Sequence, residues 1–267
     1  MKVEDVVPKL RRILSSYKQA IVAFSGGVDS SLLLALLRRI EGLRVTAVTI
    51  SAPYIPKKIV NIAMLIASNL NVNHVILDIS YIMENNYFLR NGPDRCYICK
   101  KTMYTEIKRA LTVTEDTVIL DGTNADDLKE NRPGLKALKE EGVLIPLAML
   151  GLTKRQIRML ARELGLPNWD NPPTTCILTR LKTGTPITLE RISRIERAEE
   201  AIAQFISTRK YALRVRDYGD IAIIEVSENT LEEIFNKRHL ILPIPVSYTH
   251  LRAHETEADL VCRLLLE

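Results

Sequence analysis

The sequence lacks the patterns that mark several classes of protein. It has no apolar run long enough to cross a bilayer and no signal-peptide pattern at its start, so we expect a cytoplasmic protein. It holds four cysteines, which in a cytosolic protein favour a metal or redox site over structural disulfides. It contains neither GxxxxGK(S/T) nor GxGxxG, which excludes a Walker-type loop and a dinucleotide-binding fingerprint.

The last residues resemble a foreign tail. Val246–Thr256, VSYTHLRAHET, and residues 259–267 match translated sequencing-adapter DNA, in which GTC TCT TAT ACA CAT CTC encodes Val-Ser-Tyr-Thr-His-Leu. We therefore expect residues 246–267 to be non-native and exclude them from the fold. The cysteines that remain are Cys96, Cys99 and Cys176.

The composition and net charge are those of a basic globular protein. Apolar residues make up 46% of the chain, the mean hydropathy is +0.01 and the net charge is +5. The length suits one large or two modest domains. The excess of positive charge fits an anionic ligand, either a nucleotide or a nucleic acid.

Apolar strands alternate with helical patterns over the first two thirds of the chain. This alternation is typical of a parallel sheet with helices on both faces. We therefore predict an α/β fold with five strands, at Ala20–Phe24, Leu43–Ile50, His74–Ile79, Thr117–Leu120 and Val143–Pro146. Helical spacing and a Thr153–Gln156 capping box predict helices over Val3–Tyr17, from Pro56 to Leu70, over Thr102–Leu111 and up to Leu164.

The last part of the chain predicts a small C-terminal α+β domain. A loop rich in Pro, Thr and Asn, Asn168–Thr185, precedes it. A helix, a two-stranded hairpin and a further helix are expected at Leu189–Ser207, at Tyr211–Arg216 with Ile221–Val226, and at Leu231–Arg238.

The stretch SGGVDSS, Ser25 to Ser31, carries the strongest chemical signal. It joins the first strand to a helix expected from Leu32, so backbone N–H groups and the positive end of the helix dipole converge on one point that suits phosphate. The two glycines allow the backbone to approach a diphosphate, and the serines add hydroxyl groups. Asp29 is placed to hold a metal ion or orient pyrophosphate. The candidate ligands are Ser25, Gly26, Gly27, Asp29, Ser30 and Ser31.

The cysteines admit more than one chemistry. Cys96 and Cys99 form a CxxC motif in the polar passage Asn85–Lys101, and Cys176 follows much later in the chain. Three thiolates can hold a [4Fe–4S] cluster with one iron left open, whereas four-coordinate zinc needs another ligand. A lone CxxC is also often a redox pair, and its spacing leaves the choice open.

Several basic residues are candidate phosphate partners. Arg214 and Arg216 lie two apart on a predicted strand and therefore share a face, which either binds a phosphate or is a solvated strand face. Arg180, Lys100 and Lys101 are further candidates, each also readable as an ordinary surface charge.

These motifs resemble those of a known superfamily. SGGVDSS matches the PP-loop of the ATP pyrophosphatases, and DGTNADD, Asp121 to Asp127, resembles their second nucleotide-binding segment, in which Asn124 and Asp126 are the expected contacts. The resemblance implies that ATP is cleaved between its α and β phosphates to adenylate a substrate oxygen, with Mg²⁺ assisting.

The remaining motifs resemble one branch of that superfamily. GPDRCYICKK, NPPTTCILTR and the run Arg214–Asp217 together resemble the LarE-type sulfur transferase, which makes the nickel-pincer cofactor of lactate racemase. The resemblance implies that both carboxylates of pyridinium-3,5-biscarboxylic acid mononucleotide are adenylated and thiolated. In one branch the cysteine matching Cys176 gives up its own sulfur. In the three-cysteine branch, which this sequence matches, Cys96, Cys99 and Cys176 hold a [4Fe–4S] cluster that carries a sulfide. An acidic residue of the family corresponds to Glu200 or to its neighbour Glu199.

The resemblance also sets the expected organisation. Residues 1–167 form the PP-loop domain, 168–187 the active-site loop and 188–245 a small substrate or oligomerisation domain that is incomplete at its end, followed by the tail 246–267. We expect a nucleotide-like small-molecule substrate, a homo-oligomer and a downstream nickel-inserting enzyme, without a membrane or nucleic acid. The alternatives are a cluster-dependent tRNA thiolase, another PP-loop adenylating synthetase or amidotransferase, and a regulatory nucleotide- or metal-binding module without turnover.

Overall fold

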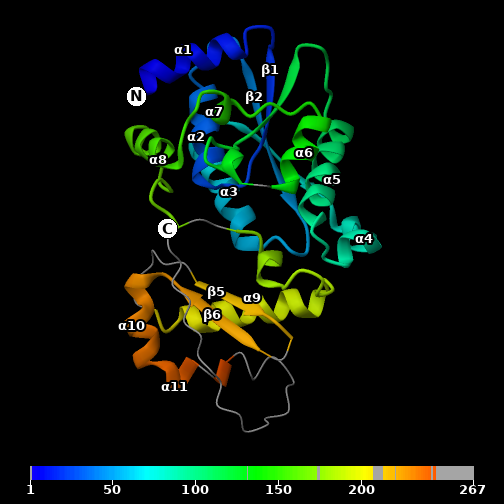
Figure 1. Ribbon diagram of the computed structural model, residues 1–267. Helices are drawn as coiled ribbons and strands as arrows, with labels where there is room; N and C mark the ends of the chain where they lie inside the picture. Colours follow the sequence, from blue (N-terminus) through cyan, green and yellow to red (C-terminus); the bar gives the residue numbers. More distant parts are fainter. Residues whose placement is uncertain are drawn as a thin grey trace. The chain divides into compact units, whose positions relative to one another are not determined.

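The computed structural model describes residues 2–130, 132–172, 175–206, 213–219, 221–241 and 243–244 (Figure 1). The chain divides into two compact units, one of residues 1–88 and 93–171 and the other of residues 89–92 and 172–267. The tail expected at 246–267 lies outside the described residues.

The first unit is built on a parallel sheet of four strands in the order β3-β2-β1-β4. Its strands are β1 (Gln19–Ala23), β2 (Arg44–Ser51), β3 (Asn73–Asp78) and β4 (Thr117–Asp121). Its helices are α1 (Val3–Ile13), α2 (Val28–Leu37), α3 (Lys57–Asn69), η1 (Ser80–Glu84), α4 (Asn86–Leu89, which reaches the unit boundary), α5 (Arg95–Ala110), η2 (Asp127–Lys129), α6 (Pro133–Glu140), α7 (Pro146–Met149) and α8 (Lys154–Glu163).

Helices cover both faces of this sheet, as the apolar strands predicted. Side chains of α1, α2, α3 and α8 form one core with Ala20 and Val22 of β1, and α2 is the centre of that core because nine of its ten residues are buried. Helices α5 and α6 lie together on the opposite side (Figure 1). The α/β architecture expected from the sequence is confirmed.

The strand order reverses direction at the carboxyl end of β1. From β1 the chain continues outward to β2 and β3, and it then returns to place β4 on the other side of β1. The loops that follow β1 and β4 therefore leave neighbouring strands in different directions, which is where open α/β sheets bind ligands. SGGVDSS follows β1, and DGTNADD begins on the last residue of β4.

The structure corrects three expected boundaries. The fifth strand is a single parallel bridge between Leu144 and Leu120, because Pro146 begins α7 and stops the pairing. Helix α2 begins at Val28 rather than Leu32, so the second half of SGGVDSS is helical. Helix α5 begins at Arg95 rather than Thr102, so the CxxC motif is helical and not part of a polar loop.

The second unit packs a hairpin on a helix. Its elements are η3 (Ile177–Arg180), α9 (Leu189–Ala203), the antiparallel strands β5 (Leu213–Asp217) and β6 (Ala222–Val226), α10 (Glu228–Asn236) and α11 (Arg238–Ile241). Its core joins α9 to both strands and to α10. The sequence did not predict that residues 89–92 belong here, where the Asn91 carbonyl accepts from the Gly184 N–H at 2.8 Å and Asn91 Nδ2 donates to the Lys182 carbonyl at 2.9 Å.

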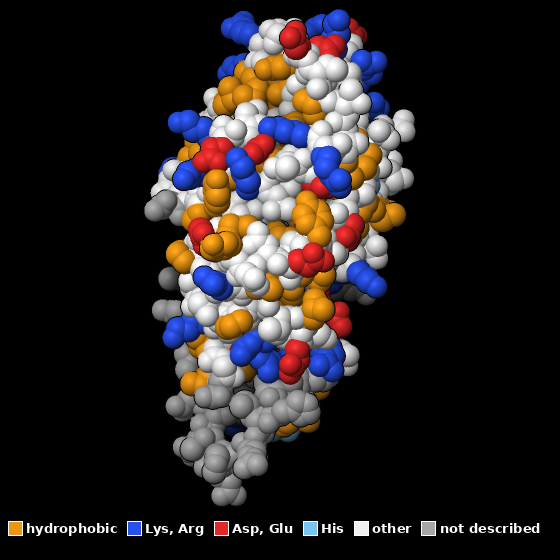
Figure 2. Space-filling model, turned by 90° about the vertical axis from the view of Figure 1, so that its right-hand side faces the viewer, with side chains coloured by type: hydrophobic (Ala, Val, Ile, Leu, Met, Phe, Trp, Pro, Cys, Tyr) orange, Lys and Arg blue, Asp and Glu red, His pale blue; other side chains and the backbone are white. Residues whose placement is uncertain are grey.

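The surface mixes charged and apolar side chains. On the face shown in Figure 2, Lys and Arg lie among Asp, Glu and hydrophobic side chains and do not merge into one basic patch. Among the described residues, no helix is both long and apolar enough to span a membrane.

Candidate functional site

The turn between β1 and α2 presents a helix N-terminus to solvent. Gly27 is the N-cap residue of α2, so the backbone N–H groups of the first helical turn have no acceptor within the helix. The Gly27 N–H meets the exposed Ser25 hydroxyl at 3.3 Å, and that hydroxyl lies 3.3 Å from Ser30 Oγ. Donors and the positive helix end therefore point to one place, as an anion site requires.

Two glycines are required by the close packing of this turn. Gly26 has a φ of +72°, and a Cβ there would lie 3.1 Å from the backbone of Ala63 in α3. A Cβ on Gly122, which follows β4, would lie 2.9 Å from the Ser30 backbone nitrogen. The loops after β1 and β4 therefore touch through their backbones, and glycine fits both contacts.

The serines of the turn differ in role. Ser25 is exposed, and Ser30 donates to the Gly27 carbonyl at 3.1 Å. Ser31 is fully buried and accepts a hydrogen bond from Asn168 at 3.0 Å. Ser25 is thus the hydroxyl open to a ligand, whereas Ser31 holds the turn from behind.

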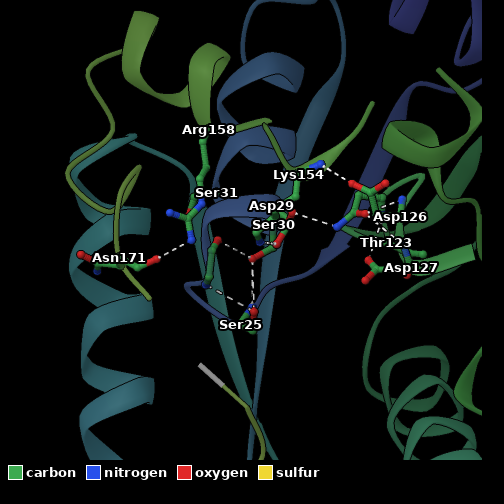
Figure 3. A network of polar contacts seen from close by, with 12 residues as sticks. Ser25, Asp29, Ser30, Ser31, Thr123, Asp126, Asp127, Lys154, Arg158 and Asn171 are labelled. Atoms are coloured by element: carbon green, nitrogen blue, oxygen red, sulfur yellow. Dashed lines mark hydrogen bonds and ion pairs between the residues drawn. The ribbon is translucent and has the colours of Figure 1, made fainter. Parts of the chain in front are cut away.

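Asp29 is the centre of a polar network between the two loops and α8 (Figure 3). Its Oδ1 accepts from Asn124 Nδ2 at 3.2 Å, and its Oδ2 forms an ion pair with Lys154. Asn124 is buried and also accepts the N–H groups of Asp126 and Asp127 at 2.9 and 3.1 Å. The sequence prediction that Asp29 and Asn124 belong to one site is consistent with this geometry, although no ligand is present to test it.

Asp126 has structural partners on both carboxylate oxygens. Oδ1 accepts from Lys129 at 2.7 Å, and Oδ2 accepts from the Lys154 backbone N–H at 2.8 Å. These bonds hold the pKa of Asp126 below its usual value, the Lys129 bond having the larger effect. In this structure Asp126 fixes the start of α8 and thereby places the Lys154 side chain beside Asp29.

Lys100 and Lys101 do not lie in the Asp29 network. Lys100 forms a 2.7 Å ion pair with Asp121 at the end of β4, and Lys101 pairs with Glu140 and Glu141 at 3.1 and 2.8 Å. Both lysines therefore join α5 to neighbouring elements, whereas Lys154 forms an ion pair with Asp29.

Cys96 and Cys99 lie one turn apart on α5. Cys96 is exposed, and its sulfur is 3.9 Å from a guanidinium nitrogen of Arg95. Cys99 is partly buried, and its sulfur is 3.3 Å from the Tyr54 hydroxyl. Burial raises the pKa of the Cys99 thiol, with Tyr54 and Lys100 acting in the opposite direction. Burial thus favours the neutral thiol at Cys99.

Cys176 lies in the second unit, exposed, immediately before η3. Arg180 holds this turn, because its NH1 group donates to the carbonyls of Thr175 and Cys176 at 3.1 and 3.2 Å. Its Nε donates to Glu199 of α9 at 2.9 Å. Arg180 is 8% exposed, so its role in this structure is to fix the Cys176 turn on α9.

The two arginines of β5 also differ. Arg216 donates to Glu225 at 2.6 Å and to the Thr179 carbonyl at 2.9 Å. The backbone of Arg214 pairs with Glu225 of β6, but its side chain has no hydrogen bond or ion pair to any residue that the structure describes. Its pKa is lowered by burial and then by the nearby charge of Arg180. Arg214 is therefore the guanidinium with free donors for an anion.

Of the two acidic candidates on α9, the structure brings Glu199 into this cluster. Glu199 binds Arg180 and also accepts from the Val215 N–H at 3.0 Å, whereas Glu200 is exposed. The choice between Glu200 and Glu199 as a substrate contact stays a prediction, because no substrate is present. Glu225 also belongs to this cluster, because its Oε1 accepts from Arg216. Its Oε2 is buried without a hydrogen-bond partner among the described residues.

Comparison with known proteins identifies the family. Residues 19–89 match the queuosine biosynthesis protein QueC family. The chain is 37% identical to an uncharacterized protein of Methanocaldococcus jannaschii, over 84% of both chains, and 30% identical to one of Synechocystis, over 86% of this chain and 84% of the relative. It is 32% identical to the pyridinium-3,5-bisthiocarboxylic acid mononucleotide synthase of Lactiplantibacillus plantarum, over 84% of this chain and 81% of that one. The chain belongs to the LarE-type family of PP-loop ATP pyrophosphatases.

LarE-type proteins share with other PP-loop enzymes the use of ATP with Mg²⁺, and the residues here fit that ion. Asp29 supplies the carboxylate oxygen that Mg²⁺ prefers, at the mouth of the loop. Its present partner, Lys154, is a cation, which is consistent with a position that attracts positive charge.

For an iron-sulfur cluster, this LarE-type chain has three candidate donors, which are divided between the two units. Three thiols can ligate a [4Fe–4S] cluster, but Cys96 and Cys99 belong to one unit and Cys176 to the other. No group of three His, Cys, Asp or Glu side chains within the described ranges is arranged to hold a metal ion.

The sequence prediction did not name three residues that the structure places in these polar clusters, Lys154, Asn168 and Glu225, and it left the choice between Glu199 and Glu200 open. Two of them had a signal. A lysine at the first position of a helix opposes the helix dipole, and a glutamate inside the apolar strand AIIEV needs a buried partner. Asn168 had none, because its partners Gly26 and Ser31 are 142 and 137 residues away.

Proposed function

We propose that this protein is an ATP-dependent sulfur transferase that acts on pyridinium-3,5-biscarboxylic acid mononucleotide. The Lactiplantibacillus plantarum relative is named for the product, pyridinium-3,5-bisthiocarboxylic acid mononucleotide, and the proposed substrate is the corresponding biscarboxylic acid. The observation that carries the proposal in this chain is the Cys176 turn. It is fixed by Arg180 and Arg216 in the same unit as Arg214, whose donors are free. We infer that the phosphate of the substrate binds Arg214, in the same unit as the Cys176 thiol.

The reaction needs activation before sulfur transfer. A substrate carboxylate oxygen attacks the α phosphate of ATP, which forms an acyl adenylate and releases pyrophosphate. A sulfur nucleophile then attacks the acyl carbon and AMP leaves, giving a thiocarboxylate. Repetition on the second carboxylate consumes a second ATP. The first-turn N–H groups of α2 and the Lys154 ammonium bind the departing pyrophosphate, and Asp29 holds the Mg²⁺.

The sulfur source is a separate part of the proposal. The thiols of Cys96, Cys99 and Cys176 would hold a [4Fe–4S] cluster, which supplies an open iron for a sulfide when bound. In the competing route Cys176 Sγ attacks the acyl adenylate and expels AMP, which gives a thioester. Loss of the Cys176 Cα proton then breaks the Cβ–Sγ bond, which releases the thiocarboxylate and leaves dehydroalanine at position 176. Anaerobic reconstitution distinguishes them: iron and a brown chromophore that are lost in a Cys96→Ala, Cys99→Ala, Cys176→Ala variant support the cluster. A wild-type chain that takes up no iron contradicts it.

Thiolation of the mononucleotide tests the main proposal. The reconstituted chain, incubated with the substrate, Mg·ATP and sulfide, should release AMP and pyrophosphate and replace oxygen by sulfur, read by mass spectrometry. Cys176→Ala should abolish the product, while Cys262→Ala, in the excluded tail, should leave it unchanged. Thiolation of bulk tRNA without thiolation of the mononucleotide would favour the tRNA thiolase. The absence of a merged basic patch on the face in Figure 2 argues against that alternative.

A further inference from the structure

One buried side chain joins both halves of SGGVDSS from behind. Asn168 lies between α8 and the unit boundary and is 3% exposed. Its Nδ2 donates to the Gly26 carbonyl at 2.8 Å and to Ser31 Oγ at 3.0 Å. Gly26 belongs to the loop and Ser31 to the first turn of α2, so a single amide group holds the loop against the helix.

The bond to Gly26 determines where the next N–H points. In a trans peptide the C=O and the following N–H point in opposite directions. Asn168 donates to the Gly26 carbonyl from the buried side of the loop. The Gly27 N–H therefore points the other way, toward the exposed Ser25 hydroxyl. Its bond to that hydroxyl is long, at 3.3 Å, and a phosphate oxygen can replace it.

Packing alone does not account for asparagine at this position. Asn168 Oδ1 is buried and has no hydrogen-bond partner among the described residues, which is unfavourable. Leucine has a similar shape and no unpaired acceptor. What leucine cannot do is donate to Gly26 and Ser31.

We propose that Asn168 is a positioning residue for ATP: it holds the PP-loop with the Gly27 N–H directed at the phosphates. This inference rests on the proposed function, because it assigns the loop to ATP. Asn168 does not itself touch the nucleotide, since its donors face the buried side of the loop. Its effect on binding is exerted through Gly26 and Ser31.

The test compares Asn168→Leu with Asn171→Ala. Asn171 lies in the same segment, and its hydrogen bonds to described residues are made by its backbone: the carbonyl accepts from Arg158 at 3.2 Å, and the N–H donates to the Asn168 carbonyl at 3.3 Å. Alanine therefore keeps both bonds (Figure 3). Titration calorimetry with Mg·ATP should show about a tenfold rise in Kd for Asn168→Leu, equivalent to about 1.4 kcal/mol. Asn171→Ala should bind as the wild type does. Asn168→Asp, which has the same size but cannot donate, should behave like the leucine variant.

Hydrogen exchange without nucleotide separates positioning from general stability. In both Asn168 variants the amides of Ser25–Ser31 should exchange faster, while β2 keeps its wild-type protection. Wild-type exchange in the loop, or equal acceleration across β1 and β2, would overturn the inference. Because this measurement uses no ATP, it decides the role of Asn168 even if the wild-type chain fails to bind ATP, a result that would contradict the proposed function instead.

Discussion

Lys154 shows how one residue acquires a role through its neighbours. Its backbone is fixed by Asp126 and its ammonium by Asp29, so it stands at the mouth of the loop with 34% of its side chain exposed. A cation at the first position of a helix is unfavourable for the helix dipole. A phosphate ligand would compensate for that cost.

We expect Lys154→Met to weaken ATP binding more than AMP binding. Loss of a charge-assisted contact to phosphate should raise the Kd for Mg·ATP by about tenfold or more, since such bonds contribute about 1.5–3 kcal/mol. Because AMP lacks the two outer phosphates, the substitution should weaken AMP binding less than ATP binding. Lys129→Met is the matched control, because Lys129 binds the same Asp126 but is 73% exposed. Equal losses for ATP and AMP would show that the substitution disrupts the whole site.

The residues that sequence reasoning found are those whose neighbours in the chain define their environment. Gly26, Gly27 and Asp29 follow a strand and open a helix, so their backbone geometry can be read locally. Lys154 meets Asp29 across 125 residues, and no local pattern predicts that ion pair. The same holds for Asn168.

Elements were predictable to the degree that their hydrophobic pattern was strong. The sequence predicts β1 and β4 from their apolar runs and β2 from its β-branched residues. Helix α5 instead begins in RCYICKK, whose charged residues are typical of a loop. Helix α6 was not expected. Pro133 lies at the start of this helix, where proline is tolerated. With only eight residues, the helix has no apolar stripe long enough to identify it from the sequence.

A buried network joins α5 to the end of β4. Asp121 accepts from Lys100 and from the Tyr104 hydroxyl, and its other oxygen accepts the Thr123 N–H at 2.9 Å. Burial alone would raise the pKa of Asp121, but the charge and hydrogen bond of Lys100 outweigh it and lower the pKa to about 2. The CxxC helix and the second nucleotide loop are thus fixed by one carboxylate.

This network makes the free energy of unfolding depend on pH in the acidic range. Because the folded pKa of Asp121 lies below its unfolded value, the stabilisation is present above about pH 4 and is lost as the pH falls toward about 2. The difference in unfolding free energy between wild type and Asp121→Asn should shrink by about 2 kcal/mol over that range. Denaturant titrations at several pH values measure it, with exposed Glu115→Gln as control. A difference that does not vary with pH would contradict the assignment.

At the scale of the whole molecule, each unit has its own hydrophobic core. The first is centred on α2, and the second joins α9 to β5 and β6. A ligand that binds one folded unit stabilises that unit by mass action, by about 2.7 kcal/mol at a concentration of 100 Kd.

We therefore expect calorimetric unfolding in two transitions. Mg·ATP should raise the midpoint temperature of one of them. In Lys154→Met the rise should be smaller at the same ATP concentration, while the other transition stays unchanged. A single transition that moves as a whole would show that the units unfold cooperatively.

The burial of α2 decides which parts of the site are free to rearrange. Nine of its ten residues are enclosed, so its N-terminus cannot shift without opening the core. The backbone donors at this N-terminus are therefore stationary, and their reorganisation energy on binding an anion is small. If ATP binds here as proposed, any closure over it must come from less enclosed groups such as the Lys154 side chain and the exposed Ser25. An inhibitor should accordingly match its phosphate end rigidly to the α2 terminus and leave its other contacts adaptable.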